Sequence, residues 1–220
     1  MTPDNPFLQA LLAEPDDDTL RLALADWLTE NDQPERAEFI RVQIELACGV
    51  SDLERRRELE IRQRDLLIAH EVQWVRPLAA VLGCKPGQWG GWVFRRGFVE
   101  YFHLPASVIN RRGTQLTRLT PVRELFLRPC TPGNITTMCQ RPWLHSVIAL
   151  YIRSAPLNVP AVQALVDCPF LTNLRALDVV LQDGLPEWSK NALLLRFAHA
   201  LPEPTVRALR PPPPSDRMGP

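Results

Sequence analysis

The sequence predicts an α/β protein in which an N-terminal helical module is followed by a short solenoid of parallel strands. Three observations support this fold class. Apolar residues recur at helical spacing through residues 1–82, glycine and tryptophan become frequent after residue 83, and three strand-like segments repeat at offsets of 25 and 27 residues. Of the 220 residues, 45% are hydrophobic and 23% are charged, a composition that forms a core without disulfides or metal.

The first fifty residues predict three short helices. Pro6 and Pro34 stand at first-turn positions, where the missing N–H would have no helical partner. Three consecutive carboxylates at positions 16–18 precede the second helix and suit the positive end of its dipole. Asp26 on the second helix and Arg41 on the third form a predicted ion pair that sets the helix packing.

A longer helix follows, and after it the residue composition changes. Leu59 and Leu66 lie among dense mixed charge, which predicts a partly exposed linking helix that is interrupted near Pro77. The segment 85–97 contains four glycines and two tryptophans, which indicates a domain boundary near residue 85. The predicted modules are a helical module at 1–50, a linking helix at 51–84, an α/β domain at 85–200 and a proline-rich disordered tail at 201–220.

Three strand-like segments share one pattern of aliphatic residues. Its three columns are Val122, Val147 and Leu174; Leu125, Leu150 and Leu177; and Leu127, Ile152 and Val179. A segment that starts at Phe98 and precedes a possible helix forms a divergent first unit. Units of this size cannot bury their own apolar face, so they stack on one another. The L-x-x-L-x-L pattern is typical of leucine-rich repeats, and a compact α/β domain with coincidental spacing is the alternative.

Residues 7–48 contain a set of positions that match a known module, namely Pro15–Asp18, Leu22, Ala25–Leu28, Ala37–Gln43 and Glu45–Ala47. Through these positions the segment resembles the bacterial repeat-companion domain. This chain has Ala37 where the family usually has glycine, a mild departure. Residues 92–182 resemble more loosely the segments that commonly follow this module. The resemblance implies the start of a planctomycete or myxobacterial protein whose remainder is often a repeat, and it brings no catalytic residue and no cofactor.

The formal net charge is zero, but the charges are unevenly distributed. Residues 1–40 hold ten acidic residues against two arginines, whereas residues 95–128 hold seven arginines against two glutamates. These arginines could contact nucleic-acid phosphates beside stacking aromatic side chains, an acidic partner protein, or the acidic helices of the chain itself. The nucleic-acid hypothesis would use Arg95, Arg96, Arg111 and Arg112.

No pattern of catalytic or metal-binding residues stands out. The five cysteines and four histidines are scattered, and the sequence contains no CxxC pair, nucleophile elbow or phosphate-binding loop. We therefore expect no enzyme activity, no metal and no cofactor. The N-terminal segment lacks a basic stretch before an apolar run, and no long apolar run occurs elsewhere. We expect a cytoplasmic chain without a membrane partner.

These features favour a non-catalytic scaffold or adaptor that binds another protein within a bacterial cytosolic assembly. A nucleic-acid-binding accessory subunit is the alternative. Alternate strand residues point away from the core, and stacking would place them in one patch. The predicted protein-binding residues are Arg123, Glu124, Phe126, Arg128, Tyr151, Arg153, Arg175 and Asp178. Because a four-unit solenoid leaves its ends open, we expect a multi-subunit complex.

Overall fold

The computed structural model describes residues 4–85 and 91–209. The chain divides into two compact units, residues 1–126 and 127–220. The first unit contains α1 (Pro6–Ala13), α2 (Asp18–Glu30), α3 (Pro34–Ala47), α4 (Leu53–Leu82), β1 (Gly91–Arg95), β2 (Phe98–Leu104) and α5 (Ala106–Leu116). β3 (Glu124–Leu127) lies at the division. The second unit contains α6 (Pro132–Met138), the 3-10 helix η1 (Pro142–Ser146), β4 (Ala149–Leu157), α7 (Val159–Asp167), β5 (Ala176–Leu181), α8 (Glu187–Phe197) and α9 (Glu203–Leu209).

The described strands form one sheet in the order β1-β2-β3-β4-β5. β1 and β2 pair antiparallel, and β4 and β5 pair parallel. The predicted α/β class and the helical N-terminal part are therefore confirmed, whereas the solenoid stays a prediction. No helix in the described ranges combines the length and the apolar character that crossing a membrane requires.

The first three helices begin where the sequence predicts. The side chain of Asn5 accepts a hydrogen bond from the Leu8 N–H at the start of α1, and that of Asp17 caps α2 in the same way. The predicted pair between Asp26 and Arg41 is confirmed at 2.7 Å. Apolar residues of these helices share one core, which consists of Leu8, Leu11, Leu24, Ala25, Leu28, Ala37, Ile40, Ile44 and Phe98 from β2.

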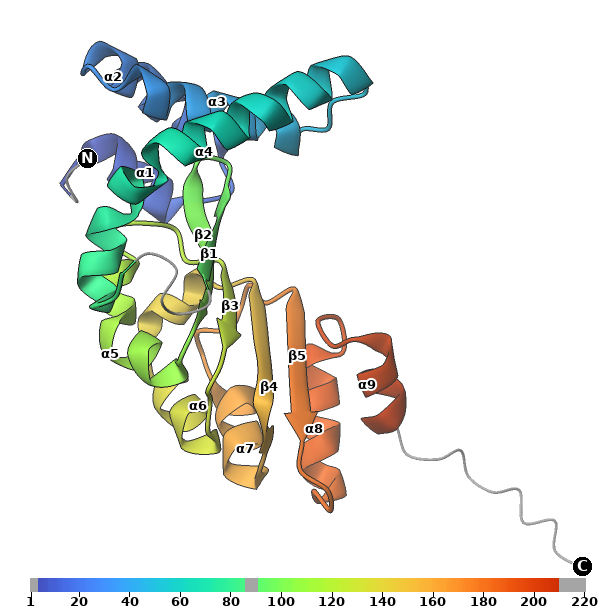
Figure 1. The fold of residues 1–220 in the computed structure, drawn as a ribbon. Coiled ribbons are helices and arrows are strands. Elements are labelled where there is room, and N and C mark those ends of the chain that lie inside the picture. The colour runs from blue at the N-terminus through green and yellow to red at the C-terminus, as the bar shows by residue number, and fades with distance from the viewer. Residues whose placement is uncertain (1–3, 86–90, 210–220) are drawn as a thin grey trace, which may run out of the picture. The chain divides into compact units, whose positions relative to one another are not determined.

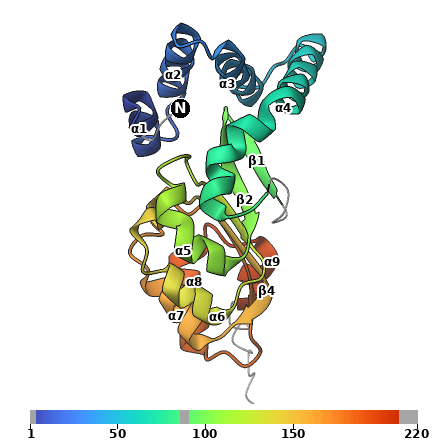
Figure 2. The same ribbon diagram turned by 60° about the vertical axis from the view of Figure 1, so that its left-hand side comes forward.

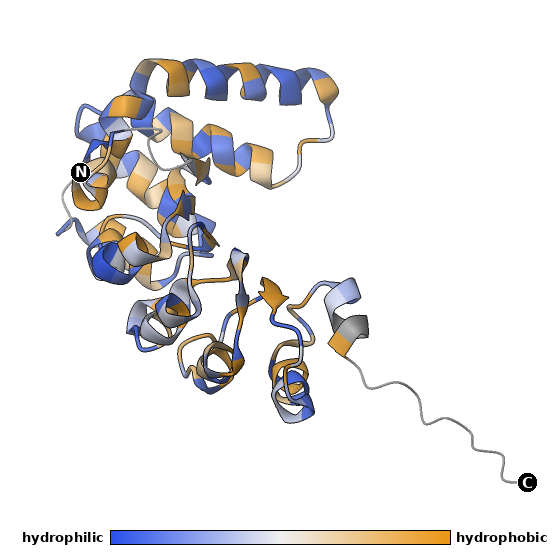
Figure 3. Ribbon diagram, turned by 60° about the horizontal axis from the view of Figure 1, so that its bottom comes forward, coloured by the Kyte–Doolittle hydropathy of each residue, from blue (hydrophilic) through white to orange (hydrophobic). Residues whose placement is uncertain are grey.

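α4 is one continuous helix through Pro77, so the predicted interruption is wrong. The helix continues because Leu78, Ala79 and Leu82 beyond the proline are buried, and their packing offsets the lost backbone hydrogen bond. Figure 1 shows that the end of α4 turns away from the direction of its first part. Figure 3 shows mixed polar and apolar bands along this helix, which agrees with its predicted partial exposure.

β1 and β2 form a hairpin whose two-residue turn, Arg96-Gly97, meets the helical part (Figure 1 and Figure 2). Both turn residues have positive φ angles, 46° and 91°, as tight hairpin turns that match the strand twist require. A Cβ atom on Gly97 would lie only 2.4 Å from Cγ1 of Ile40 in α3. Glycine is therefore needed here both for its backbone angle and for the close approach of the helix.

Three side chains of α2 and α3 hold the backbone of this turn. Arg21 Nη1 donates to the Arg96 carbonyl oxygen at 2.9 Å, and Arg36 Nη2 donates to the Gly97 carbonyl oxygen at 2.5 Å. The Gly97 N–H donates to Oε1 of Gln43 at 2.7 Å. Because buried backbone groups need partners, these bonds fix the position at which the hairpin enters the helical part.

In the second unit, β4 and β5 pair in the register that the repeat predicts. Leu150 lies opposite Leu177, and Ile152 lies opposite Val179. All nine residues of the three aliphatic columns are buried. Helices α7 and α8 follow these strands and pack against each other, as Figure 1 shows. The column alignment is therefore confirmed for this pair of strands.

The end of the second unit differs from the predicted disordered tail. Residues 203–209 form the short helix α9, because Pro204 occupies a first-turn position where a proline is tolerated. Just before it, the Ala200 carbonyl oxygen accepts a hydrogen bond from the Leu177 N–H of β5 at 2.7 Å. One backbone N–H at the edge of β5 is therefore paired with a carbonyl oxygen of the same chain. Residues 210–220 of the predicted tail lie outside the described residues.

Replacing Gly97 by alanine is expected to destabilise the first unit more than replacing Gly49, which has a similar φ of 85° but nothing within 4 Å of its Cβ position. The positive φ costs about 1–2 kcal/mol at either site, and the overlap with Ile40 adds about 1–3 kcal/mol at Gly97 alone. Urea-induced unfolding followed by circular dichroism measures both free energies. Equal losses in the two variants would show that the turn does not press on α3.

Candidate functional site

Arginines of the first unit pair with carboxylates of the same unit. Arg21 Nη2 contacts Glu100 Oε1 at 2.6 Å, and the two side chains are 0% and 4% exposed. Burial is the main cause that raises the pKa of Glu100, while the positive charges of Arg21 and Arg96 oppose that rise. Because the oxygen is within 2.6 Å of one guanidinium and 3.7 Å of the other, we treat Glu100 as ionised.

Two carboxylates at the start of α2, those of Asp16 and Asp18, contact further arginines of the first unit. Asp16 receives two hydrogen bonds from Arg123 at 2.7 and 2.8 Å, and Asp18 lies 3.3 Å from Arg96. The sequence predicted an N-cap and early-turn carboxylates here, and Asp17 is the N-cap of α2 while Asp18 lies in its first turn; the pairing of Asp16 and Asp18 with arginines is additional. The pairing of the arginine-rich segment with the chain's own acidic residues, one of three alternatives, is thus what these contacts show.

The four arginines of the nucleic-acid hypothesis lie in two kinds of surroundings. Arg95 pairs with Glu124 at 2.8 Å, and Arg96 is only 21% exposed among carboxylates. Arg111 and Arg112 are exposed on α5. The hairpin arginines are therefore paired with carboxylates within the chain, although Arg95 is still 49% exposed, whereas Arg111 and Arg112 are exposed on α5.

The predicted protein-binding residues of the first unit are partly accessible. Arg123 is buried and holds Asp16, so its charged end is directed into the chain. Glu124 and Phe126 are half-buried on β3. The Phe126 ring makes an edge contact with His103 of β2, with ring centroids 4.6 Å apart. These two side chains form the aromatic part of the strand face in this unit.

The second unit brings three predicted residues together. Tyr151 lies opposite Asp178 in the β4–β5 register, and Arg153 Nε donates to Asp178 Oδ2 at 2.7 Å. Arg153 is 63% exposed in this pair, and Arg128 and Arg175 are also exposed. The alternation of the strands thus turns an aromatic ring, a cation and a carboxylate away from the aliphatic columns.

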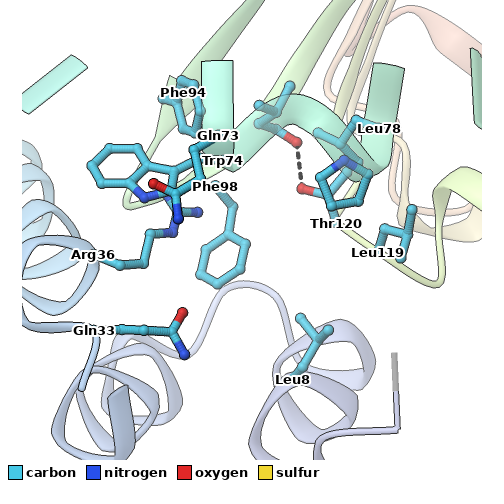
Figure 4. Close-up of a pocket in the computed structure, with 12 residues that line it drawn as sticks. Leu8, Gln33, Arg36, Gln73, Trp74, Leu78, Phe94, Phe98, Leu119 and Thr120 are labelled. Atoms are coloured by element: carbon cyan, nitrogen blue, oxygen red, sulfur yellow. Dashed lines mark hydrogen bonds between the residues drawn. The ribbon is translucent and has the colours of Figure 1, made fainter. Parts of the chain in front are cut away.

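The first unit also contains a pocket of about 130 Å³ that the sequence did not predict (Figure 4). It lies where α1, α3, α4, the β1–β2 hairpin and the segment after α5 meet. Its lining consists of Leu8, Gln33, Arg36, Gln73, Trp74, Pro77, Leu78, Phe94, Phe98, Val99, Leu119 and Thr120. No acidic side chain occurs in this set of described residues.

Arg36 is the charged group of the pocket. Its Cζ lies 4.7 Å from the centre of the Trp74 ring and 5.4–5.6 Å from the ring centres of Phe39, Phe94 and Phe98. Burial lowers the pKa of Arg36 to about 9, so the side chain stays protonated at neutral pH. Nη2 donates to Gly97, whereas Nη1 is buried without a hydrogen-bond partner in the described structure.

Sequence reasoning missed this pocket because its walls come from distant segments. Arg36 and Trp74 are 38 positions apart, and the two phenylalanines of the hairpin lie a further 20 to 24 positions along the chain. No local spacing connects them. Arg36 was the one signal in the sequence, as a cation near the start of the third helix. Helical periodicity alone predicts that such a charged side chain faces solvent.

The cysteines form no metal or disulfide site in the described structure. All five are free, and within the described ranges no group of three His, Cys, Asp or Glu residues could hold a metal ion. Cys168 Sγ donates to the Cys139 carbonyl oxygen at 3.2 Å, and both thiols are buried. Burial of this kind limits the access of oxidants and electrophiles.

Comparisons of the chain with protein-family models, curated proteins and solved structures find no match. The resemblance to the repeat-companion domain therefore stays a prediction, and the functional argument depends on the contacts described above.

Replacing Glu100 by alanine is expected to cost about 3–5 kcal/mol of stability, because it removes the nearest and only buried counter-charge of the Arg21 guanidinium in the described structure and leaves Asp18, which is partly exposed and 3.5 Å from Nε. The matched control is Asp26→Ala, which removes an exposed pair with Arg41 and should cost less than about 1 kcal/mol. Urea unfolding of both variants provides the comparison. A small loss for Glu100→Ala would mean that water or another carboxylate takes over the charge of Arg21.

Proposed function

We propose that the chain is a non-catalytic protein-recognition module, with the outward-facing strand residues as its contact surface. In this proposal it acts as a scaffold or adaptor subunit of a bacterial cytosolic assembly. The observation that carries the proposal is the register of β4 and β5, which sets Tyr151 beside Asp178 and opposite to the buried columns.

The chemistry of this face suits a protein partner. Tyrosine and arginine dominate the energetics of protein interfaces, because they combine a large contact area with hydrogen-bonding groups. Tyr151 supplies the ring, and the ion pair with Asp178 already orders Arg153. An ordered side chain loses less conformational entropy when a partner binds. Val180, which is 41% exposed on β5, adds apolar area.

Nucleic-acid binding is the second candidate, and the exposed arginines of α5 support it. Arg111 and Arg112 would contact phosphates without base specificity, and their affinity would fall steeply with salt. The hairpin arginines contribute less to this hypothesis, because Arg95 and Arg96 are paired with carboxylates. Titration of the chain with an oligonucleotide at low salt, in wild type and in Arg111→Glu/Arg112→Glu, distinguishes the two candidates.

Affinity capture followed by mass spectrometry tests the protein-recognition proposal. The double variant Tyr151→Ala/Arg153→Ala should lose partners that the intact chain retains. The matched control is Trp188→Ala/Lys190→Ala, which removes an exposed aromatic ring and an ion-paired cation from α8. Both variants should first be shown to unfold at the midpoint of the wild type.

A partner that is lost with the strand variant and kept with the α8 control supports the proposal. If both variants capture the same proteins as the wild type, the strand face is not the contact surface. If the captured proteins are lost after nuclease treatment, their binding to the chain depends on nucleic acid.

A further inference from the structure

The charged end of Arg36 is buried without an anion. In the same unit, Arg21 is fully buried and contacts a carboxylate at 2.6 Å, whereas Arg36 is half-buried as a residue. Around Arg36 the described lining offers aromatic rings, two amides and apolar side chains. The rings stabilise the cation through their negative faces, yet Nη1 still has no acceptor. Arg36 lines the pocket, and no salt bridge to a carboxylate compensates its charge in the described structure, so an anion that enters the pocket gains an electrostatic partner.

The start of α3 adds to the positive character of the pocket. Gln33 is the N-cap residue of this 14-residue helix, and its side chain makes no capping hydrogen bond. The N-terminal end of a helix carries a partial positive charge. Gln33 and Gln73, whose amide groups can donate, also line the pocket, and exposed Gln73 and Pro77 mark its solvent side. Figure 4 shows Gln33 and Arg36 extending from α3 towards the rings.

The rest of the pocket is apolar and small. Leu8, Leu78 and Leu119 face the polar end across the cavity, as Figure 4 shows. The Thr120 hydroxyl donates to the Val99 carbonyl oxygen at 2.7 Å. The volume of about 130 Å³ is close to that of an engineered cavity that accepts benzene, so a ligand of about six non-hydrogen atoms fits.

We propose that this pocket binds a small aliphatic monocarboxylate of the size of butyrate. The carboxylate faces the guanidinium of Arg36, which lines one side of the pocket, and the aliphatic end packs among the leucines of the opposite wall. The proposal is independent of the strand face, because it uses other residues. The same chemistry could come from a free acid or from a glutamate side chain of a protein, and we commit to the free acid.

Titration with sodium butyrate tests the proposal, with butyramide as a neutral analogue of nearly the same shape. The readouts are the guanidinium ¹⁵N resonances of Arg36 and the thermal midpoint of the intact chain. We expect saturable binding with a dissociation constant on the order of 1 mM, which suits a ligand of this size. Butyramide should bind about 10- to 150-fold more weakly, the range expected for loss of a hydrogen bond between charged groups. Equal binding of butyrate and butyramide, or no saturable shift with either, would overturn the proposal.

Two variants and a control assign the binding to the pocket. Arg36→Gln removes the charge, and Leu119→Trp fills the apolar end without touching the guanidinium. Each should abolish the saturable shift. Arg111→Gln removes the same charge from an exposed site on α5 and should leave it unchanged. Since Arg36→Gln also loses the bond to Gly97, the folded fraction is checked first, and Leu119→Trp decides the result if that variant is unstable. Binding that survives Leu119→Trp in a folded chain would place the carboxylate elsewhere.

Two further probes distinguish the source and the class of the anion. An acetylated and amidated peptide with a single glutamate should bind at least tenfold more weakly than butyrate, because the closed end of the pocket has no room for a backbone. Tighter binding of the peptide would overturn the free-acid assignment. Inorganic phosphate should also bind more weakly than butyrate, since it leaves the apolar wall unfilled. Phosphate binding tighter than that of butyrate would overturn the carboxylate assignment.

Discussion

The turn between β1 and β2 is the constraint on which the first unit depends. Its two residues need positive φ angles, its glycine lies against α3, and its backbone is held by side chains from α2 and α3. This placement brings Phe98 into the core of the helices and sets Glu100 beside Arg21. The same turn accepts the one hydrogen bond of Arg36, so the cluster and the pocket have a common origin.

Arg21 and Arg36 show different solutions to one electrostatic problem. Removing a guanidinium from water costs several kcal/mol unless partners replace the water. Arg21 receives those partners from a carboxylate and two carbonyl oxygens. Arg36 receives them from four aromatic rings and one carbonyl oxygen. Each arginine keeps one buried N–H without a hydrogen-bond partner in the described structure, so what distinguishes them is the carboxylate that Arg21 contacts and that Arg36 lacks.

The sequence predicted the features that depend on local pattern. Period-2 alternation and a repeated aliphatic triplet were enough to predict that Leu150 and Leu177 are neighbours. The pair between Asp26 and Arg41, which joins two predicted helices, was also predicted. Where tertiary packing decides, local rules failed. Pro77 stays helical because the residues after it are buried, and the pocket joins residues from five separate segments. Propensity and spacing contain no information about such distant contacts.

β2 contributes residues both to the pocket and to the outward strand side chains that we propose as a contact surface. Val99 lines the pocket near the start of β2, and His103 reaches Phe126 near its end. A shared strand does not by itself couple two sites, because coupling needs an element with two arrangements that both ligands bias. The β1–β2 turn is held by three side chains of α2 and α3, and β2 pairs along its length with β1. The two proposals use different residues, since the carboxylate would contact Arg36 and the leucines of the pocket and a partner would contact the outward side chains of the strands. Either proposal can therefore fail without the other.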